Sequence, residues 1–195
     1  MQKICTIFED WLIEDGSYPE LHKGQKINVS LCLEVRNNYK KVSEHKEGYL
    51  KRKKYSKYSF SGKILSKNYY ISIGDNDKLI LRLDTGRMKN IEEEGDFVEG
   101  VGNIYVDPIN EVTEYEAVIE KVYKVFIPEK YISRSKNGLG APCSLKPEYY
   151  SREDVKQVDK MPNNLYNKVS PLKAEVVFYL LELSINIDYT KEAKI

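Results

Sequence analysis

The sequence is poor in the residues that build disulfide frameworks, metal centres and nucleophilic sites. Its 195 residues include only two histidines and three cysteines. Cys5, Cys32 and Cys143 lie far apart and match no C-x-x-C spacing, which argues against a zinc site or a set of disulfides. An odd number of scattered cysteines is typical of a reducing compartment. We therefore expect a cytoplasmic protein with no metal and no cofactor.

Catalytic groups are equally hard to assemble. His22 and His45 both fall in predicted loops, and nothing in the sequence brings either histidine near Cys143. A nucleophilic cysteine needs a base or a positive field to form its thiolate. The Gly138-Leu139-Gly140 segment is not followed by a lysine, so it does not match a phosphate-binding loop. We predict a binding protein and not an enzyme, and carboxylate-based hydrolysis is the remaining enzymatic alternative.

Long hydrophobic runs and a large net charge are also missing. No apolar run reaches the roughly 18 residues of a membrane-spanning helix, and the first residues lack the hydrophobic segment of a signal peptide. The 31 Lys and Arg nearly balance the 30 Asp and Glu, which gives a net charge of +1. The total charge therefore does not draw the chain to a membrane or to nucleic acid. The length fits a single domain over residues 1–195.

The sequence does contain repeated two-residue alternation of apolar and polar residues. The clearest case is a hairpin over residues 60–83, in which apolar side chains alternate on both sides of the turn-forming Gly74-Asp75-Asn76-Asp77. The same pattern predicts five strands, over residues 25–35, 69–73, 79–83, 97–106 and 115–126. The predicted fold class is mainly β, an antiparallel barrel or sandwich, and Gly100 and Gly102 predict a bend or bulge in the fourth strand.

The two ends of the chain are less clear. Residues 3–14 fit either a helical stripe or a strand buried on both faces. Residues 174–189 alternate over seven positions, which favours a C-terminal strand over a helix beginning at Ser170-Pro171.

Residues 128–170 lose the strand alternation and form an irregular excursion from the core barrel. Ser151 and Asp154 match the spacing of a capping box, which predicts a short helix over residues 151–160.

The order of the predicted strands resembles the OB-fold, a five-stranded Greek-key barrel. The resemblance covers residues 25–127, with a first strand, a long loop, a hairpin and two further strands. The segment from Gly95 to Asp107, GDFVEGVGNIYVD, is similar to the fourth strand of that barrel in its glycine placement. The resemblance implies that the loop after the first strand borders the binding face. Other antiparallel barrels or sandwiches fit the pattern nearly as well.

Charge is strongly polarised along the chain. Residues 36–58 hold nine Lys and Arg against two Glu, a net of +7. No apolar period runs through them, so we expect a long solvated loop or an extended strand end. Lysines contact phosphates and tyrosines stack on bases, so this stretch suits single-stranded nucleic acid. The candidate residues are Tyr39, Tyr49, Lys51, Arg52, Lys53, Lys54 and Tyr55.

Residues 91–120 hold ten acidic residues and no Lys or Arg. An acidic surface suits a basic protein partner, because opposite charges speed encounter and reject wrong partners. A calcium site is a weaker interpretation, because the spacing matches no EF-hand. The candidate residues for a protein partner are Asp107, Glu111, Glu114 and Glu116.

The preferred interpretation is a protein-interaction module of the inhibitor or immunity type that uses the acidic surface. Arginine is scarce in residues 36–58, and the acidic loop over residues 107–116 is expected to face that stretch across a groove and to repel phosphates. Single-stranded nucleic-acid binding by the basic stretch is the alternative. A third interpretation is a solvated lysine-rich face attracted to the protein's own acidic half. No membrane partner is expected.

Overall fold

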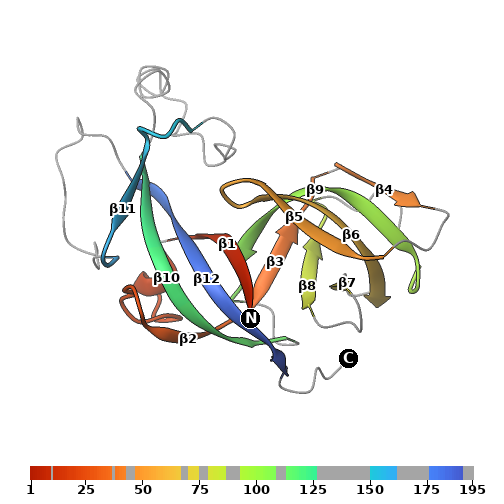
Figure 1. The fold of residues 1–195 in the computed structure, drawn as a ribbon, viewed down its shortest axis with the longest axis horizontal. Coiled ribbons are helices and arrows are strands. Elements are labelled where there is room, and N and C mark those ends of the chain that lie inside the picture. Colours follow the sequence, from red (N-terminus) through yellow and green to blue (C-terminus); the bar gives the residue numbers. More distant parts are fainter. Residues whose placement is uncertain are drawn as a thin grey trace.

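The computed structural model describes residues 1–9, 11–36, 38–42, 47–66, 70–74, 79–86, 93–108, 113–126, 150–161 and 176–190. Within these residues the chain is mainly β-structure, as predicted, and its strands form two adjoining groups (Figure 1). A single helical turn, α1 (Trp11–Glu14), follows the first strand. In this described part of the chain, no helix is long and apolar enough to cross a membrane.

The first group of strands is a closed barrel. β6 pairs antiparallel with β7, and β7 pairs antiparallel with β8. β8 lies parallel to β3, and β9 closes the ring by pairing antiparallel with both β3 and β6. The barrel strands are β3 (Leu31–Glu34), β6 (Lys57–Ser66), β7 (Tyr70–Ile73), β8 (Leu79–Asp84) and β9 (Phe97–Val106).

Two further strands extend the barrel wall. β4 (Tyr39–Val42) pairs with β9, and β5 (Tyr49–Lys54) pairs with β6. Most of the described basic stretch is therefore in strands. The sequence predicts either a long solvated loop or an extended strand end, and the strands agree with the second of these. The sequence of this stretch shows no apolar alternation, because an edge strand that faces water needs few apolar side chains.

The second group of strands packs beside the barrel. β10 pairs with β12 along one edge, and β12 pairs in turn with β1. On its other edge, β10 pairs with β2 near its start and with β11 near its end. The strands are β1 (Gln2–Phe8), β2 (Lys26–Val29), β10 (Tyr115–Phe126), β11 (Val155–Val158) and β12 (Val176–Thr190). The segments 3–14 and 174–189 both contribute strands, β1 and β12, to this group.

One predicted strand, over residues 25–35, is shared between the two groups. It breaks at Ser30 into β2, which pairs with β10, and β3, which pairs with β8 and β9. The Ser30 hydroxyl donates to the Thr113 carbonyl oxygen at 2.6 Å, and the Asp107 amide donates to the Ser30 carbonyl oxygen at 2.9 Å. These bonds satisfy the polar groups where the chain changes partners.

The barrel is compatible with an OB-like fold, but its fifth strand is not the predicted one. The sequence predicts that residues 115–126 complete the barrel, whereas in the described residues β10 pairs with β2, β11 and β12 and with none of the barrel strands. The place is taken by β6, for which the sequence predicts one continuous hairpin arm together with β7. Alternate residues of β6, Tyr58, Phe60 and Ile64, are buried, so the alternation is present but is interrupted by lysines and serines.

The predicted helix over residues 151–160 is wrong. The capping pair does form, because the Ser151 amide and hydroxyl both donate to Asp154 Oδ2, at 2.7 and 2.8 Å. The chain then enters the strand β11 and pairs with β10. Most of the excursion over residues 128–170 and the turn at residues 75–77 lie outside the described residues.

The main hydrophobic core runs through both groups of strands. Ile4, Val122 and Leu183 from the second group join Phe60 and Leu81 from the barrel in one buried cluster. A smaller cluster lies on the opposite face of β1 and contains Cys5, Ile7, Val125, Tyr150, Phe178 and Leu180. β1 is therefore buried on both faces, which is the second of the two structures that its sequence allowed.

Leu81→Ala and Leu31→Ala should each lower the free energy of unfolding by about 2–5 kcal/mol, because both leucines are fully buried in the main core. Chemical denaturation monitored by circular dichroism measures this change. Leu50→Ala is the matched control, since Leu50 is only partly buried against the same cluster and should cost less. An unchanged midpoint in both core variants would contradict this assignment of the core.

Gly100→Ala should destabilise the protein by about 1–3 kcal/mol, the usual cost of overpacking. A Cβ atom at Gly100 would lie 2.3 Å from the Asn38 carbonyl oxygen, so β4 could not approach β9 as closely. Glu99→Ala, next to it on β9, removes only an ion pair to Lys40 and should cost less than about 1 kcal/mol. Equal midpoints for the two variants would count against this close approach.

Candidate nucleic-acid interface

The basic stretch reaches the second group of strands through the tip of the β5–β6 hairpin. Tyr55 and Ser56 form the two-residue turn at this tip. Tyr55 has a left-handed backbone, with φ of 49°, which is uncommon for a large residue. The Arg52 Nε donates to the Tyr55 carbonyl oxygen at 2.8 Å, which closes the turn. Contacts around the tip must offset the strain of this conformation.

Two hydrogen bonds anchor the tip on the segment that precedes β11. The Lys54 ammonium donates to the Tyr150 carbonyl oxygen at 2.8 Å, and the Tyr55 hydroxyl donates to the Ser151 carbonyl oxygen at 3.1 Å. The Tyr150 ring is itself buried edge-on against Phe178, with 5.3 Å between ring centroids. The hairpin tip is therefore tied to a packed part of the second group.

A row of aligned residues crosses the outer face of the second group beneath the hairpin. Lys121 on β10 is paired in register with Glu182 on β12, and Glu182 is paired with Cys5 on β1. Arg52 comes down from β5 and contacts Glu182 at 2.9 Å, while Lys121 contacts the same carboxylate at 3.2 Å. Burial disfavours the charged carboxylate, but hydrogen bonds from the two cations prevail and lower the pKa of Glu182.

A cleft of about 250 Å³ lies between the hairpin tip and this outer face. Its base is apolar, with Leu180, Val155 and the buried Cys5. Two half-buried tyrosine rings, Tyr55 from the hairpin and Tyr123 from β10, line it and pack against the smaller hydrophobic cluster. Its charged residues are Arg52, Arg152 and Glu182.

A second hollow, of about 470 Å³, lies on the other side of β5, outside the barrel. We call it the outer groove. It is lined by Tyr39 and Lys40 of β4, by Tyr49 and Lys53 of β5, and by residues of β6 and β9. Tyr49 is one of two large hydrophobic side chains that are exposed in the described part of the chain, at 44%. Three candidate residues from the sequence, Tyr39, Tyr49 and Lys53, therefore meet in one hollow, while Arg52 and Tyr55 line the cleft.

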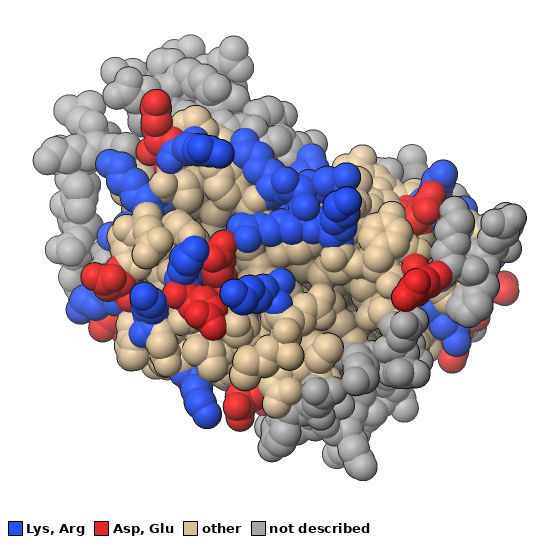
Figure 2. Space-filling view, viewed as in Figure 1, with Lys and Arg blue, Asp and Glu red and all other residues tan. Residues whose placement is uncertain are grey.

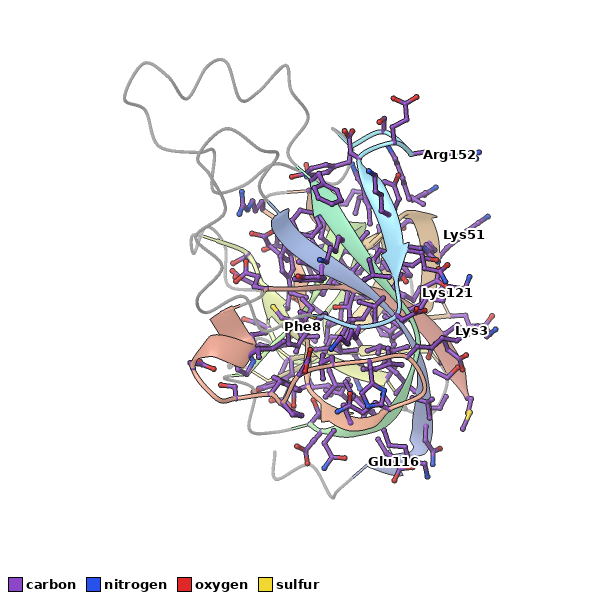
Figure 3. All side chains as sticks on the ribbon, turned by 90° about the vertical axis from the view of Figure 1, so that its left-hand side faces the viewer. Lys3, Phe8, Lys51, Glu116, Lys121 and Arg152 are labelled. Carbon is purple, nitrogen blue, oxygen red and sulfur yellow. The ribbon has the colours of Figure 1, made fainter. Side chains whose placement is uncertain are left out.

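Cations from distant parts of the chain share one face of the molecule with β5. Figure 3 shows Lys3, Lys51, Lys121 and Arg152 along one side of the protein, and we call these four residues the basic face. That side is turned toward the viewer in Figure 2, where Lys and Arg side chains gather over the region of β5. The sequence pattern indicates only Lys51 among them, because the other three are isolated in sequence and come together only in the folded chain.

The acidic candidates lie elsewhere. Asp107 is buried and accepts a hydrogen bond from Arg82, so it does not contribute to an open surface. Glu116 is exposed and lies 3.9 Å from Lys26. Glu114 and Asp107 line a pocket of about 530 Å³ beside β2, and Glu111 lies outside the described residues. None of these described acidic candidates lines the cleft or the outer groove.

Some lysines of the basic stretch form ion pairs with residues of the acidic stretch. Lys40 and Lys41 of β4 form ion pairs with Glu99 and Asp96, at 3.1 and 2.6 Å. The predicted attraction between the basic stretch and the acidic half therefore applies to β4. On β5, Arg52 instead pairs with Glu182, which is outside the acidic stretch.

The described cysteines are unsuited to catalysis. Cys5 and Cys32 are buried, and burial raises the pKa of each thiol to about 12, so neither forms a thiolate near neutral pH. Cys143 and His45 lie outside the described residues. Among the residues that the structure describes, no group of His, Cys, Asp and Glu could hold a metal ion.

Glu182→Gln should destabilise the protein at neutral pH and should have less effect in acid. The pKa of this carboxyl is lowered in the folded state, so its contribution is present above its ordinary pKa of 4.5 and is lost as the pH falls through the folded value. Urea unfolding of wild type and of Glu182→Gln between pH 7 and pH 3 measures the difference between their free energies of unfolding.

Glu116→Gln is the matched control for this titration, because its ion pair is long and exposed and should contribute less than about 1 kcal/mol. If the free energies of unfolding of wild type and Glu182→Gln differ by the same amount across the pH range, the charge of Glu182 does not contribute to stability.

No protein-family model, no curated protein and no solved structure matches this chain, so its function is argued from the geometry of these hollows and of the basic face.

Proposed function

We propose that this protein binds single-stranded nucleic acid along β5. The observation that carries the proposal is the meeting of cations with exposed or half-exposed tyrosines on both sides of this strand. Lys51 lies on the basic face, Lys53 lies in the outer groove with Tyr49, and Arg52 lies in the cleft with Tyr55. Grooves that combine positive charge with aromatic rings suit single strands, because unpaired bases can stack on the rings.

The arrangement favours a single strand over a duplex. Aromatic rings that line hollows of this kind can stack only on bases whose faces are open. The candidate cations are mostly lysines, which contact phosphates as point charges and do not require a particular base. A single strand of little sequence preference therefore fits this surface best.

The main objection from the sequence is weaker in the folded chain. The acidic loop was expected to face the basic stretch and to repel phosphates. The described acidic residues of segment 107–116 instead line a separate pocket, are buried or pair with Lys26. Among the described residues, only Glu182 brings a carboxylate to the lining of the cleft, and its charge is compensated by Arg52 and Lys121.

A second candidate function is the binding of a basic protein partner. The pocket beside β2 supports it, because two of the acidic candidates, Asp107 and Glu114, line this space of about 530 Å³. A lysine or arginine side chain of a partner would fit such a pocket. Asp107 already accepts a hydrogen bond from Arg82, which reduces the negative charge available to a partner.

Wild-type protein should bind a fluorescent twelve-residue oligothymidylate with an affinity that falls steeply with salt. Replacing both Lys51 and Lys53 with Gln should weaken binding several-fold and reduce the slope of log K against log salt by about 0.7 for each lysine that contacts a phosphate. Fluorescence anisotropy across a salt series measures both. Arg52 and Lys54 are left intact, because they hold the hairpin tip in place.

Lys26→Gln is the matched control, since Lys26 is an exposed lysine of the pocket beside β2 and should not change the slope. Wild-type protein that shows no salt-dependent binding would overturn the nucleic-acid proposal and leave the basic protein partner as the candidate.

A further inference from the structure

The cleft has features that phosphate binding alone does not require. Electrostatic contact needs cations at the surface, but the cleft adds an apolar base of Leu180 and Val155 and the rings of Tyr55 and Tyr123. An apolar hollow with aromatic sides and cations at its edge suits a flat aromatic group that carries an anion nearby.

The size of the cleft restricts its occupant. Its volume of about 250 Å³ is below the roughly 300–1,000 Å³ of pockets that enclose a drug-sized ligand. A bound dinucleotide cofactor would not fit, whereas one planar ring system would.

The position of the cleft connects it to the proposed path of the strand. Arg52 lines the cleft, and the residues on either side of it in β5, Lys51 and Lys53, lie on the basic face and in the outer groove. Arg52 is held by Glu182 and by the Tyr55 carbonyl group. Arg152 is exposed at the cleft and belongs to the basic face, so it is the cation placed to meet a phosphate there.

We infer that the cleft accepts a single base of the bound strand, stacked on Tyr123, while Arg152 contacts the adjacent phosphate. This inference rests on the proposed function, because the base is delivered by a strand that the basic face holds. The site would fix the position of the strand along β5, since one nucleotide is inserted while the others remain on the surface.

The test combines protein variants with abasic oligonucleotides. A twelve-residue oligothymidylate is prepared with a single abasic position, moved along the strand, and its affinity is measured by anisotropy. At the position that enters the cleft, the abasic change should weaken binding to wild type by about 5- to 150-fold, the range for loss of one stacked base. Tyr123→Leu should weaken binding of the intact strand similarly and should make the abasic change nearly neutral.

Two variants separate stacking from damage to the fold. Tyr123→Phe keeps the ring and should retain the effect of the abasic position. Tyr105→Leu alters another half-buried tyrosine that packs on the same small hydrophobic cluster without lining the cleft, and it should leave that effect unchanged.

Failure of this inference differs from failure of the proposed function. If the intact strand binds with a steep salt dependence but no abasic position is coupled to Tyr123, the strand stays on the surface and the inference is overturned. If the intact strand shows no salt-dependent binding, the proposed function fails and the inference falls with it.

Discussion

The contact between Arg52 and Glu182 determines the shape of the candidate interface. It joins the β5–β6 hairpin of the barrel to the outer face of the second group of strands, and Lys121 supports the same carboxylate. Glu182 is only 24% exposed, so removal of Arg52 would leave a partly desolvated charge with one partner fewer, which usually costs more than the pair itself contributes. Arg52 points toward Glu182, whereas its neighbour Lys53 lines the outer groove and its neighbour Lys51 is exposed on the basic face.

The sequence predicts the regular strands well and the irregular ones poorly. β8, β9, β10 and β12 follow from two-residue alternation, because each buries at least one face. β5 escapes prediction, since a strand whose residues are nearly all exposed needs no apolar pattern. The capping pair of Ser151 and Asp154 predicts a helix that is absent, because the backbone groups that follow it pair with β10 instead. Local hydrogen bonds of this kind also stabilise turns.

The candidate site is less predictable than the strands, because its residues come from separate parts of the chain. The cleft combines Cys5, Arg52, Tyr123, Arg152 and Leu180, which only the pairing of β1, β10 and β12 and the contact with the hairpin bring together. No spacing in the sequence reports such an arrangement. Composition identifies β5 as basic and aromatic, but it cannot separate the side that lines the cleft from the side that lines the outer groove.

The polarised charge of the chain is used in two different ways. On β4, Lys40 pairs with Glu99 of β9 and Lys41 pairs with Asp96, the residue just before β9, and the opposite charges help to join the two strands. Within the described part of the chain, β5 pairs with β6 alone, and β6 carries no acidic residue, so Lys51 and Lys53 have no carboxylate across this strand pair. The lysines of β4, in the first half of the basic stretch, are thus neutralised by ion pairs within the molecule. The lysines of the other half face outward, which is why the proposed binding surface lies on β5 and not on the whole stretch.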